Sequence, residues 1–364
     1  MTLLHLTAAT GRFAAARQVH GLPPGHPCRG LHGHNFQASA WAALPPGFAA
    51  YPGGEIGALA ARLESCLRPL QHAHLNERMS EPTDTAIAAW IAQSIELPCL
   101  ARIALQSTPE QGVERDGAGR SFAWRRYRFE AAHWLPKVAP GHKCGRMHGH
   151  GFEVVIHVRA APGAASPGTE YELLDQAWAP WRDRLDCRCL NEIEGLDNPT
   201  SEMLSSWLWT RLRPALPGLA WVGVFETPSC GASFDGQRYR IWKELALDSA
   251  VRHLHAPAHS PRHRVHGHTF KLRLNLSAPL DAVLGWTIDF GDVKQVFDPT
   301  FDRLDHRPLY EIAGLGDTDT ASLALWIFHT ARRDLPQLVG VELFEAEGRG
   351  ACVSADAAAP PLPV

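Results

Sequence analysis

The sequence predicts an α+β protein made of three tandem copies of one unit, each with the order β-β-α-α-β-β. The tripeptide His-Gly-His occurs three times, beginning at His32, His148 and His266, which lie 116 and then 118 residues apart. A repeat of this length corresponds to a whole small domain rather than to a solenoid repeat. Similar strand-like and helix-like segments surround each tripeptide. The expected units are residues 1–117, 118–238 and 239–356, followed by a Pro/Ala-rich tail, residues 357–364.

Strands are expected at both ends of each unit. An alternating segment, such as residues 124–129 or 241–247, opens the unit, and His-Gly-His leads directly into a second strand. Segments such as residues 221–225 and 339–344 close it. Alternating apolar and polar residues are typical of strands that bury one face.

Two helices are expected between these pairs of strands. In the third unit Asp289 is the expected N-cap of the first helix, and Val293, Val296 and Phe297 share one of its faces. In the second unit this helix is expected to be short, at residues 175–185. The second helix is expected to begin at capping threonines, namely Thr83, Thr200 and Thr318.

The bulk composition is that of an ordinary globular protein. The 364 residues are 45% hydrophobic and 20% charged, with a net charge of −3. No basic excess suggests a nucleic-acid footprint, and no apolar run approaches the length of a membrane span. No leader precedes the first strand-like stretch, and the eight cysteines include no C-x2-C pair. We therefore expect a cytoplasmic protein with free thiols and no membrane or nucleic-acid partner.

Each His-Gly-His places two imidazoles on the same face of a strand, because side chains at i and i+2 point the same way. In the second unit His133, at the end of the preceding strand, supplies a third imidazole in the frame Phe-Glu-Ala-Ala-His. Three neutral imidazoles with one open position are the coordination expected of a catalytic zinc. The expected zinc ligands are His133, His148 and His150 in the second unit, and His253, His266 and His268 in the third. The first unit has Arg17 in that frame, so we expect it to hold no catalytic metal. A purely structural role for these histidines is the alternative.

A cysteine near the second tripeptide is a candidate base. Cys144 lies four residues before His148, where nearby positive charge can lower the pKa of a thiol. The first unit has Cys28 at the same offset, whereas the third has Arg262, which cannot take up a proton. The alternative is that this single cysteine is an unreactive side chain that only contributes to packing.

An acid/base pair and two strand-end carboxylates complete the candidates. Asp305 and His306 can form a relay in which the carboxylate orients the imidazole. Glu226, followed by Thr227, and Glu345 end strands of the second and third units. One carboxylate can accept two N–H bonds from a flat amino-pyrimidinone edge, so these residues are expected to bind substrate. The alternative is that these acidic residues and His306 are simply exposed to solvent at the surface and have no role in the reaction.

These motifs closely resemble the 6-carboxytetrahydropterin synthase / 6-pyruvoyltetrahydropterin synthase family. The resemblance rests on the frame ending at His133 and on the run Gly-His-Lys-Cys-Gly-Arg-Met-His-Gly-His that ends at His150. It extends to residues 198–202, 288–291 and 302–306. The spacing between the cysteine and the first histidine is similar to that of the bacterial, queuosine-pathway branch.

The resemblance implies a fold, an assembly and a reaction. The fold would be the tunnelling fold, in which three units close a pseudo-trimeric barrel with helices outside, and a homodimer of chains would restore a hexamer-like body. The reaction would convert 7,8-dihydroneopterin triphosphate to 6-carboxy-5,6,7,8-tetrahydropterin with Zn²⁺. Zinc would bind the side-chain hydroxyls of the substrate, the cysteine would move a proton with help from the Asp-His pair, and the glutamate would anchor the pterin.

No unit carries every part of this machinery. The second unit has Cys187 where the third has His306, and the first has Gln71 where the third has Asp305. If the cysteine of one unit meets the pair of the next, Cys144 faces Asp305 and His306, which gives one complete site per chain. If the order is reversed, Cys144 faces only Gln71 and His72. We prefer the first arrangement because the losses in the second and third units are then complementary.

Three functions remain open at this point. The first is the zinc-dependent synthase with one composite site. The second is a non-catalytic scaffold that binds pterin or zinc. The third is another pterin side-chain lyase, such as an enzyme like 6-pyruvoyltetrahydropterin synthase. Occupancy of the third zinc site and the role of the first unit are also left open.

Overall fold

The structure is a computed structural model that describes residues 3–160, 169–281 and 285–355. The expected tail, residues 357–364, lies outside the described residues. No helix within the described residues combines the length and the apolar character needed to cross a membrane.

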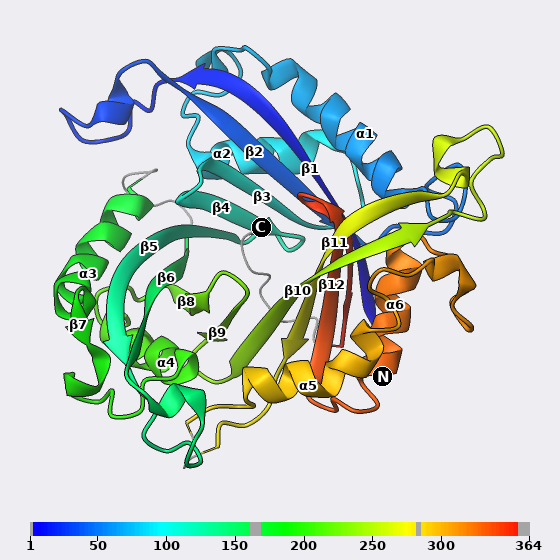
Figure 1. The fold of residues 1–364 in the computed structure, drawn as a ribbon. Helices are drawn as coiled ribbons and strands as arrows, with labels where there is room; N and C mark the ends of the chain where they lie inside the picture. Colours follow the sequence, from blue (N-terminus) through cyan, green and yellow to red (C-terminus); the bar gives the residue numbers. More distant parts are fainter. Residues whose placement is uncertain (1–2, 161–168, 282–284, 356–364) are drawn as a thin grey trace.

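Twelve strands form a closed ring, and each unit contributes four of them (Figure 1). The first unit contains β1 (Leu4–Arg17), β2 (His32–Ala42), β3 (Leu100–Thr108) and β4 (Gln111–Asp116). The second contains β5 (Ser121–His133), β6 (His148–Arg159), β8 (Leu219–Thr227) and β9 (Cys230–Phe234). The third contains β10 (Tyr239–Val251), β11 (His266–Leu276), β12 (Leu338–Ala346) and β13 (Arg349–Ser354). A short thirteenth strand, β7 (Arg188–Cys189), pairs in parallel with β5 at the end of that strand.

Three antiparallel junctions join the units into the ring. β4 pairs with β5 and β9 pairs with β10, and each of these pairs is consecutive in the sequence. The third junction joins the two ends of the chain, because β1 pairs with β13 from Leu4↔Ser354 to Ala8↔Gly350. The ring is therefore closed by residues that are more than 300 positions apart in the sequence.

Two helices lie between the second and third strands of each unit, so the predicted order of elements is confirmed. They are α1 (Glu55–Leu67), α2 (Asp84–Ser94), α3 (Glu170–Leu185), α4 (Ser201–Leu212), α5 (Phe290–Phe301) and α6 (Thr320–Ala331). Each helix contacts strands of its own unit, and α1, α3 and α5 run along the outer edge of the ring in Figure 1.

The helix starts agree with the sequence patterns at most positions. Asp289 caps α5 by accepting the N–H groups of Gly291 and Asp292, and Thr83 and Thr200 cap α2 and α4. The prediction that Thr318 caps the second helix of the third unit is wrong, because Asp319 is the cap of α6. Thr318 instead donates its hydroxyl to the carbonyl of Arg252.

The prediction of a short first helix in the second unit is also wrong. α3 has 16 residues, against 13 in α1 and 12 in α5. The helix begins at Glu170, and the acidic residues Glu170 and Glu172 in its first turn complement the positive end of the helix dipole. Leu174 and Trp178 extend its buried face.

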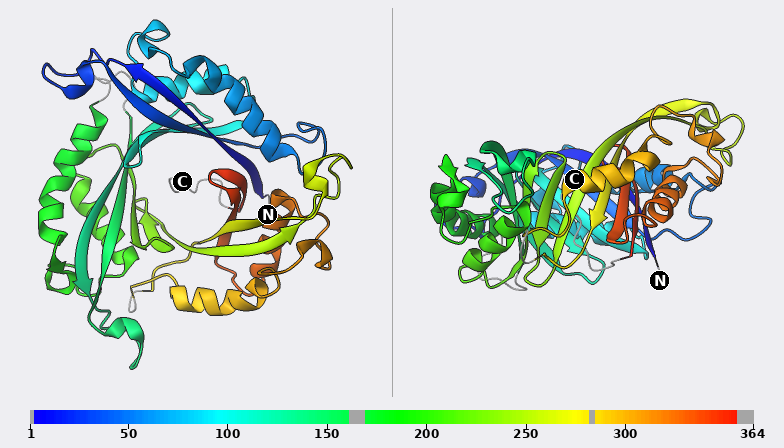
Figure 2. Two further views of the ribbon diagram at one scale, coloured as in Figure 1. Left: turned by 45° about the horizontal axis from the view of Figure 1, so that its top comes forward. Right: turned by 60° about the horizontal axis from the view of Figure 1, so that its bottom comes forward.

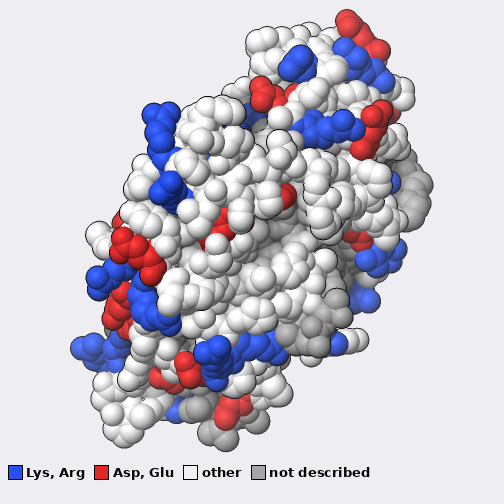
Figure 3. Space-filling model, turned by 90° about the vertical axis from the view of Figure 1, so that its right-hand side faces the viewer, with Lys and Arg blue, Asp and Glu red and all other residues white. Residues whose placement is uncertain are grey.

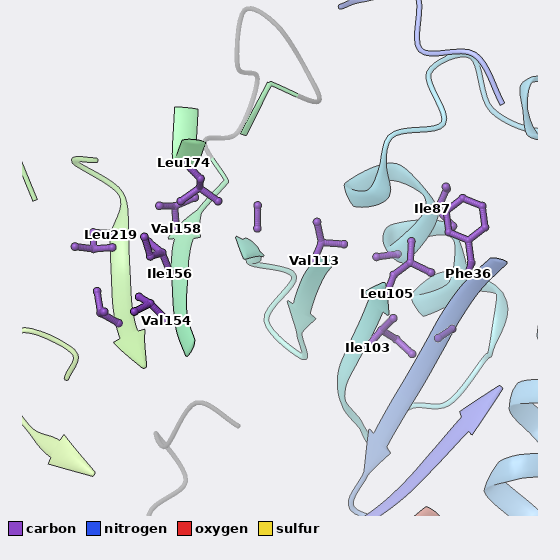
Figure 4. Packing of buried hydrophobic residues seen from close by; sticks show 14 of the residues in the cluster. Phe36, Ile87, Ile103, Leu105, Val113, Val154, Ile156, Val158, Leu174 and Leu219 are labelled. Atoms are coloured by element: carbon purple, nitrogen blue, oxygen red, sulfur yellow. The ribbon is translucent and has the colours of Figure 1, made fainter. Parts of the chain in front are cut away.

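One face of the strands carries the apolar core. Val154, Ile156 and Val158 of β6 alternate along the strand and belong to the same buried cluster as Leu174 of α3. Figure 4 shows this group and, in the first unit, Ile87 of α2 beside Phe36 of β2. Burial of this face removes apolar surface from water, which stabilises the helices on the ring by roughly 25 cal/mol per Å².

The opposite face carries buried charged and aromatic side chains. His157, between Ile156 and Val158, stacks on Trp221 with ring centroids 3.6 Å apart. Arg273 forms ion pairs of 3.0 Å with both Glu244 and Glu342. These charges are paired within the strands, as buried charges must be.

The loops that join the first and second strands project from the ring at three places (Figure 2). They are residues 18–31, 134–147 and 252–265. Each returns to the ring at a His-Gly-His tripeptide. On the face shown in Figure 3, Lys and Arg are interspersed with Asp and Glu around a broad uncharged area.

A glycine at the second position of the fourth strand is required in all three units. A Cβ on Gly231 would lie under 3.0 Å from the carbonyl oxygen of Val224 and the ring of Trp242. Gly112 and Gly350 have the same kind of surroundings. We predict that Gly231→Ala destabilises the protein by about 1–3 kcal/mol through overpacking. The thermal unfolding midpoint measures this effect.

The matched control is Gly57→Ala in α1, where a Cβ would meet no atom within 4 Å other than those of the adjoining helix backbone. Alanine there is expected to leave stability unchanged or raise it by about 0.5–1 kcal/mol, since glycine is unfavourable inside a helix. Equal midpoints for the two variants would show that the β8–β9 junction tolerates a side chain, against our prediction.

Candidate functional site

Three imidazoles of the second unit converge where β5 ends and β6 begins. His133 pairs across the strands with His148, and His150 follows on the same face of β6. The ring centroids of the three pairs lie 4.5, 5.1 and 5.2 Å apart. One ligand atom from each imidazole and one from Glu226 all lie within 4.8 Å of one another. We call this group centre 2.

The surroundings of centre 2 orient these imidazoles for a metal ion. Nδ1 of His133 donates to the carbonyl of Pro199 at 3.0 Å, and Nδ1 of His148 donates to that of Arg146 at 2.7 Å. Hydrogen bonds of this kind fix the tautomer that leaves Nε2 free to ligate. Nε2 of His133 and Nε2 of His150 are buried and lie 3.6 and 3.3 Å from Oε1 of Glu226. Burial lowers the pKa of His133, so its ring is neutral, as a ligand must be. The donor set fits zinc.

Glu226, at the end of β8, lies against this triad. Its Oε1 is 3.3 Å from Nε2 of His150, and its Oε2 accepts a hydrogen bond of 2.9 Å from the hydroxyl of Ser201. Burial works against ionisation, but these partners hold the pKa of Glu226 below its ordinary value. Thr227 lies one residue further on, and its hydroxyl contacts Cys230 Sγ at 3.1 Å within the β8–β9 turn.

Cys144 lies in the loop above centre 2. Its N–H donates to Nδ1 of His142 at 3.2 Å, which fixes a short 3₁₀ turn over Lys143–Gly145. Burial raises the pKa of Cys144, and the charges of Glu226 and Asp289 act in the same direction. The thiol is therefore protonated at neutral pH in the absence of a nearby cation.

The third unit covers centre 2 with the segment that precedes α5. The hydroxyl of Thr200 donates to the carbonyl of Gly285 at 2.6 Å, and Glu202 accepts the N–H of Thr287 at 2.9 Å. Burial raises the pKa of Glu202 to about 7. Asp289, the cap of α5, is the residue of this unit whose charge reaches Cys144. Centre 2 thus lies at a junction between two units.

Asp305 and His306 form a turn that is fixed to β10. Asp305 accepts the N–H of Asp248 at 2.9 Å, and the N–H of His306 donates to the Asp248 carbonyl at 2.6 Å. His306 Nδ1 contacts Asp305 Oδ2 at 2.8 Å, and this hydrogen bond raises the pKa of His306. The N–H of Glu244, on the same edge of β10, donates to Ser229 of the second unit. The pair therefore lies on the edge of β10 that faces the second unit.

The corresponding turns of the other two units are fixed to the first strand by the same kind of hydrogen bond, but they lack a carboxylate–imidazole pair. Gln71 accepts the N–H of Ala14 at 3.0 Å, and Asp186 accepts the N–H of Glu130 at 2.9 Å. The following residues, His72, Cys187 and His306, all have positive φ values of 54–57°. The shared hydrogen bond is thus structural, and only in the third unit does the turn also carry a carboxylate–imidazole pair. No hydrogen bond or ion pair among the described residues joins Cys144 to this pair, so their cooperation stays a prediction.

In the first unit the corresponding place holds a buried ion pair, which we call centre 1. Arg17, at the position of His133, contacts Asp84 at 2.6 Å, with side chains 6% and 3% exposed. Asp84 also accepts hydrogen bonds of 2.6 Å from Ser107 and from Tyr171, a residue of the second unit. Burial, followed by the Arg17 charge, lowers the pKa of His34 to about 4. That the first unit holds no catalytic metal stays a prediction.

The third unit has its three histidines but surrounds them differently, and we call this group centre 3. Among the described residues, the ligand atoms of His253, His266 and His268 do not all lie within 4.8 Å of one another, as those of centre 2 do. Arg262, at the position of Cys144, forms two hydrogen bonds with Glu345, of 2.5 and 3.1 Å. Metal binding at these three histidines stays a prediction.

The sequence patterns missed the residues that begin the second helix of each unit. Ser201, Asp84 and Thr320 each follow the capping residue, and each contacts the side chain at the end of the third strand. Their position directly after the cap is a signal that was present in the sequence. Tyr171 was also missed, because its contact with Asp84 depends on the packing of one unit against another.

Comparison with known proteins matches each of the three units to one family. A family model described as 6-pyruvoyl tetrahydropterin synthase matches residues 7–118, 123–237 and 240–356. The 6-carboxy-5,6,7,8-tetrahydropterin synthase of Synechocystis is 34% identical over 123 residues, covering 32% of this chain and 93% of the relative. The dihydroneopterin monophosphate aldolase of Pyrococcus furiosus is 34% identical over 97 residues, covering 27% and 78%. A solved structure of Caenorhabditis elegans 6-pyruvoyl tetrahydropterin synthase is 21% identical and covers 32% of this chain and 95% of that chain, with a TM-score of 0.29.

We predict that Asp84→Asn costs about 3–5 kcal/mol of stability at neutral pH, because it leaves Arg17 buried without its partner. Burial opposes ionisation of Asp84, but Arg17 holds its pKa below the ordinary value of 3.8. The ion pair therefore stabilises the fold fully above that pH and is lost as the pH falls through the folded-state pKa. The penalty should be constant above about pH 5 and shrink in stronger acid.

Urea unfolding at several pH values measures this difference. Asp183→Asn is the control, since Asp183 is 70% exposed in its ion pair with Arg182, and its effect should stay within about 0.5 kcal/mol. A penalty at Asp84 no larger than that of the control would mean that the buried pair does not hold centre 1 together.

Proposed function

The chain belongs to the 6-pyruvoyl tetrahydropterin synthase family, and from that premise we propose that it is a zinc-dependent lyase that converts 7,8-dihydroneopterin triphosphate to 6-carboxy-5,6,7,8-tetrahydropterin, a precursor in queuosine biosynthesis. The Synechocystis relative bears the name of this activity. The proposal assigns the units to residues 1–117, 118–238 and 239–356 and treats the ring as a pseudo-trimer with its helices outside. The four strands that each unit contributes support this arrangement.

The observation that carries the proposal is the chemistry of centre 2. Its three imidazoles and Glu226 converge within 4.8 Å, which the three histidines of centre 3 do not do within the described residues. In centre 1 an arginine replaces a ligand, and in centre 3 an arginine replaces the cysteine. These differences between the three centres favour one reaction site per chain.

In this proposal His133, His148 and His150 hold the zinc ion. When bound, zinc supplies a Lewis acid that polarises the hydroxyl groups of the substrate side chain. Its charge also favours the thiolate of Cys144, which burial alone disfavours. Glu226 accepts N–H bonds from the amino-pyrimidinone edge, while Ser201 holds its other oxygen.

Cys144, Asp305 and His306 share the proton transfers. Cys144 removes a proton from a side-chain carbon of the substrate, and His306 exchanges a proton with a side-chain oxygen. Asp305 stabilises the charged imidazole, in line with the raised pKa of His306. The composite site is supported by the position of this pair on the edge of β10 that faces the second unit.

A homodimer of pseudo-trimeric chains in the cytoplasm is part of the same proposal. Leu31, Met147 and Val265 precede the three tripeptides and are 65%, 60% and 56% exposed. Three equivalent apolar side chains beside the projecting loops are suited to a contact between two chains.

A second candidate reaction is an aldolase-type cleavage of the pterin side chain. It is favoured by the Pyrococcus furiosus aldolase, whose identity to this chain, 34%, equals that of the carboxypterin synthase relative. Product analysis separates the two: acetaldehyde and a carboxypterin support the synthase, whereas a phosphorylated aldehyde supports the aldolase. Tight pterin binding without any cleavage would support a non-catalytic scaffold instead.

We predict that Cys144→Ala and His306→Ala each lower kcat by at least about 100-fold, since each removes a proton-transfer group. Cys28→Ala and His72→Ala are the matched controls, because they change the corresponding residues of the first unit. They should leave turnover unchanged. Steady-state assays with 7,8-dihydroneopterin triphosphate, with zinc content measured in parallel, provide the test. Full activity in either the Cys144 or the His306 variant would contradict the composite site.

A further inference from the structure

The carboxylate of centre 3 is already occupied by a side chain of its own unit. Arg262 lies in the 3₁₀ turn Pro261–His263 and directs both terminal nitrogens at Glu345, at 2.5 and 3.1 Å. Glu345 is 3% exposed in this pair, and the hydroxyl of Thr320 donates to its Oε2 at 2.9 Å. Both carboxylate oxygens therefore have partners, and a two-pronged arginine contact is among the strongest that a carboxylate makes.

The corresponding carboxylate of centre 2 has a different set of partners. Glu226 also accepts a hydroxyl, from Ser201, but its other oxygen lies 3.3 Å from His150 and 3.6 Å from His133. In centre 2 the carboxylate thus contacts the metal-binding imidazoles, whereas in centre 3 it contacts a guanidinium. The geometry of the histidines differs in parallel, because only the triad of centre 2 brings its ligand atoms within 4.8 Å among the described residues.

Arg262 also lies close enough to the histidines of centre 3 to act on them directly. The N–H of His253 donates to the carbonyl of Arg262 at 3.0 Å, and the guanidinium of Arg262 contacts Glu345. A zinc ion between these rings would therefore stand beside a permanent positive charge, with Glu345 already neutralised by Arg262. Like charges at such a separation repel strongly in a partly buried site.

Centre 1 shows the same replacement by a different arginine. There Arg17 stands in the position of a ligand histidine and contacts the buried carboxylate of Asp84 at 2.6 Å. In both centres a guanidinium, which stays charged at every physiological pH, balances a buried carboxylate next to a His-Gly-His pair. The two centres therefore share one charge arrangement, built from arginines at different positions of the unit.

We propose that Arg262 replaces the metal ion as the cation of centre 3, so that this centre binds no zinc and the chain carries a single zinc ion, in centre 2. The identity of the ion in centre 2 rests on the proposed function. The role of Arg262 is structural: it ties the loop 252–265 to the end of β12 through Glu345. Removal of its side chain should open a second metal site.

Zinc stoichiometry of the full-length chain tests this proposal. The proteins are the wild type, His148→Ala, Arg262→Ala, the double variant and Arg264→Ala. Arg264 lies in the same loop and is exposed, so it is the matched control. Each protein is stripped with a chelator, loaded with excess zinc and passed over a weak competing chelator, and its metal content per chain is measured by mass spectrometry. Circular dichroism verifies folding.

We expect one zinc ion per chain in the wild type and in Arg264→Ala, none in His148→Ala, two in Arg262→Ala and one in the double variant. Two ions in the wild type, one ion retained in His148→Ala, or no gain in folded Arg262→Ala would each overturn the proposal. If Arg262→Ala does not fold, His148→Ala decides alone, because its centre 3 is unaltered: no zinc supports the proposal and one zinc ion overturns it.

Failure of the proposed function gives a different pattern. One tightly bound zinc without turnover would refute the reaction and leave the role of Arg262 intact. No zinc in the wild type would remove the metal from centre 2. The zinc content of Arg262→Ala would then decide. One zinc ion more than in the wild type supports the role of Arg262, and an unchanged zinc content overturns it.

Discussion

Pairing of β13 with β1 is the contact on which the rest of the molecule depends. It joins the two ends of the chain and turns three consecutive four-stranded segments into one ring. Once the ring is closed, every unit has a neighbour on both sides. The segment before or at the start of each unit's first helix then lies against a centre of the adjacent unit: Tyr171 contacts Asp84, Thr287 contacts Glu202, and Gly53 lies beside Asp319. No centre is formed by one unit alone.

Fusion of the units into one chain explains how the three centres can differ. In a ring of identical subunits each substitution would appear in every centre at once. In a tandem chain each copy of a residue changes separately. All three centres retain a buried carboxylate next to a hydroxyl, but in the first unit the two have exchanged positions, Asp84 with Ser107 in place of Ser201 with Glu226. The cation that faces the carboxylate is Arg17 in centre 1 and Arg262 in centre 3. In centre 2 that place is taken by the imidazoles of His133 and His150.

Local features of the sequence were sufficient for much of the fold and for the convergence of the three histidines in centre 2. The order of strands and helices follows from alternation, periodicity and caps such as Asp289, which act over a few residues. His148 and His150 share a face because of strand geometry, and His133 pairs across from them because the two strands are joined by a single loop. Contacts between units were beyond this kind of reasoning. The bond of Tyr171 to Asp84 depends on the packing of one unit against the next, and the bond of Arg262 to Glu345 depends on the conformation of a loop. No short pattern encodes either of them.

The central claim is that one of the three related centres has kept a metal ion and the other two have replaced it with arginine. Crystals of the zinc-loaded protein, with diffraction recorded on both sides of the zinc absorption edge, test it most directly. We predict one anomalous peak per chain, within about 2.0–2.1 Å of a nitrogen of His133, His148 and His150. A peak between His253, His266 and His268, or no peak in centre 2, would contradict it.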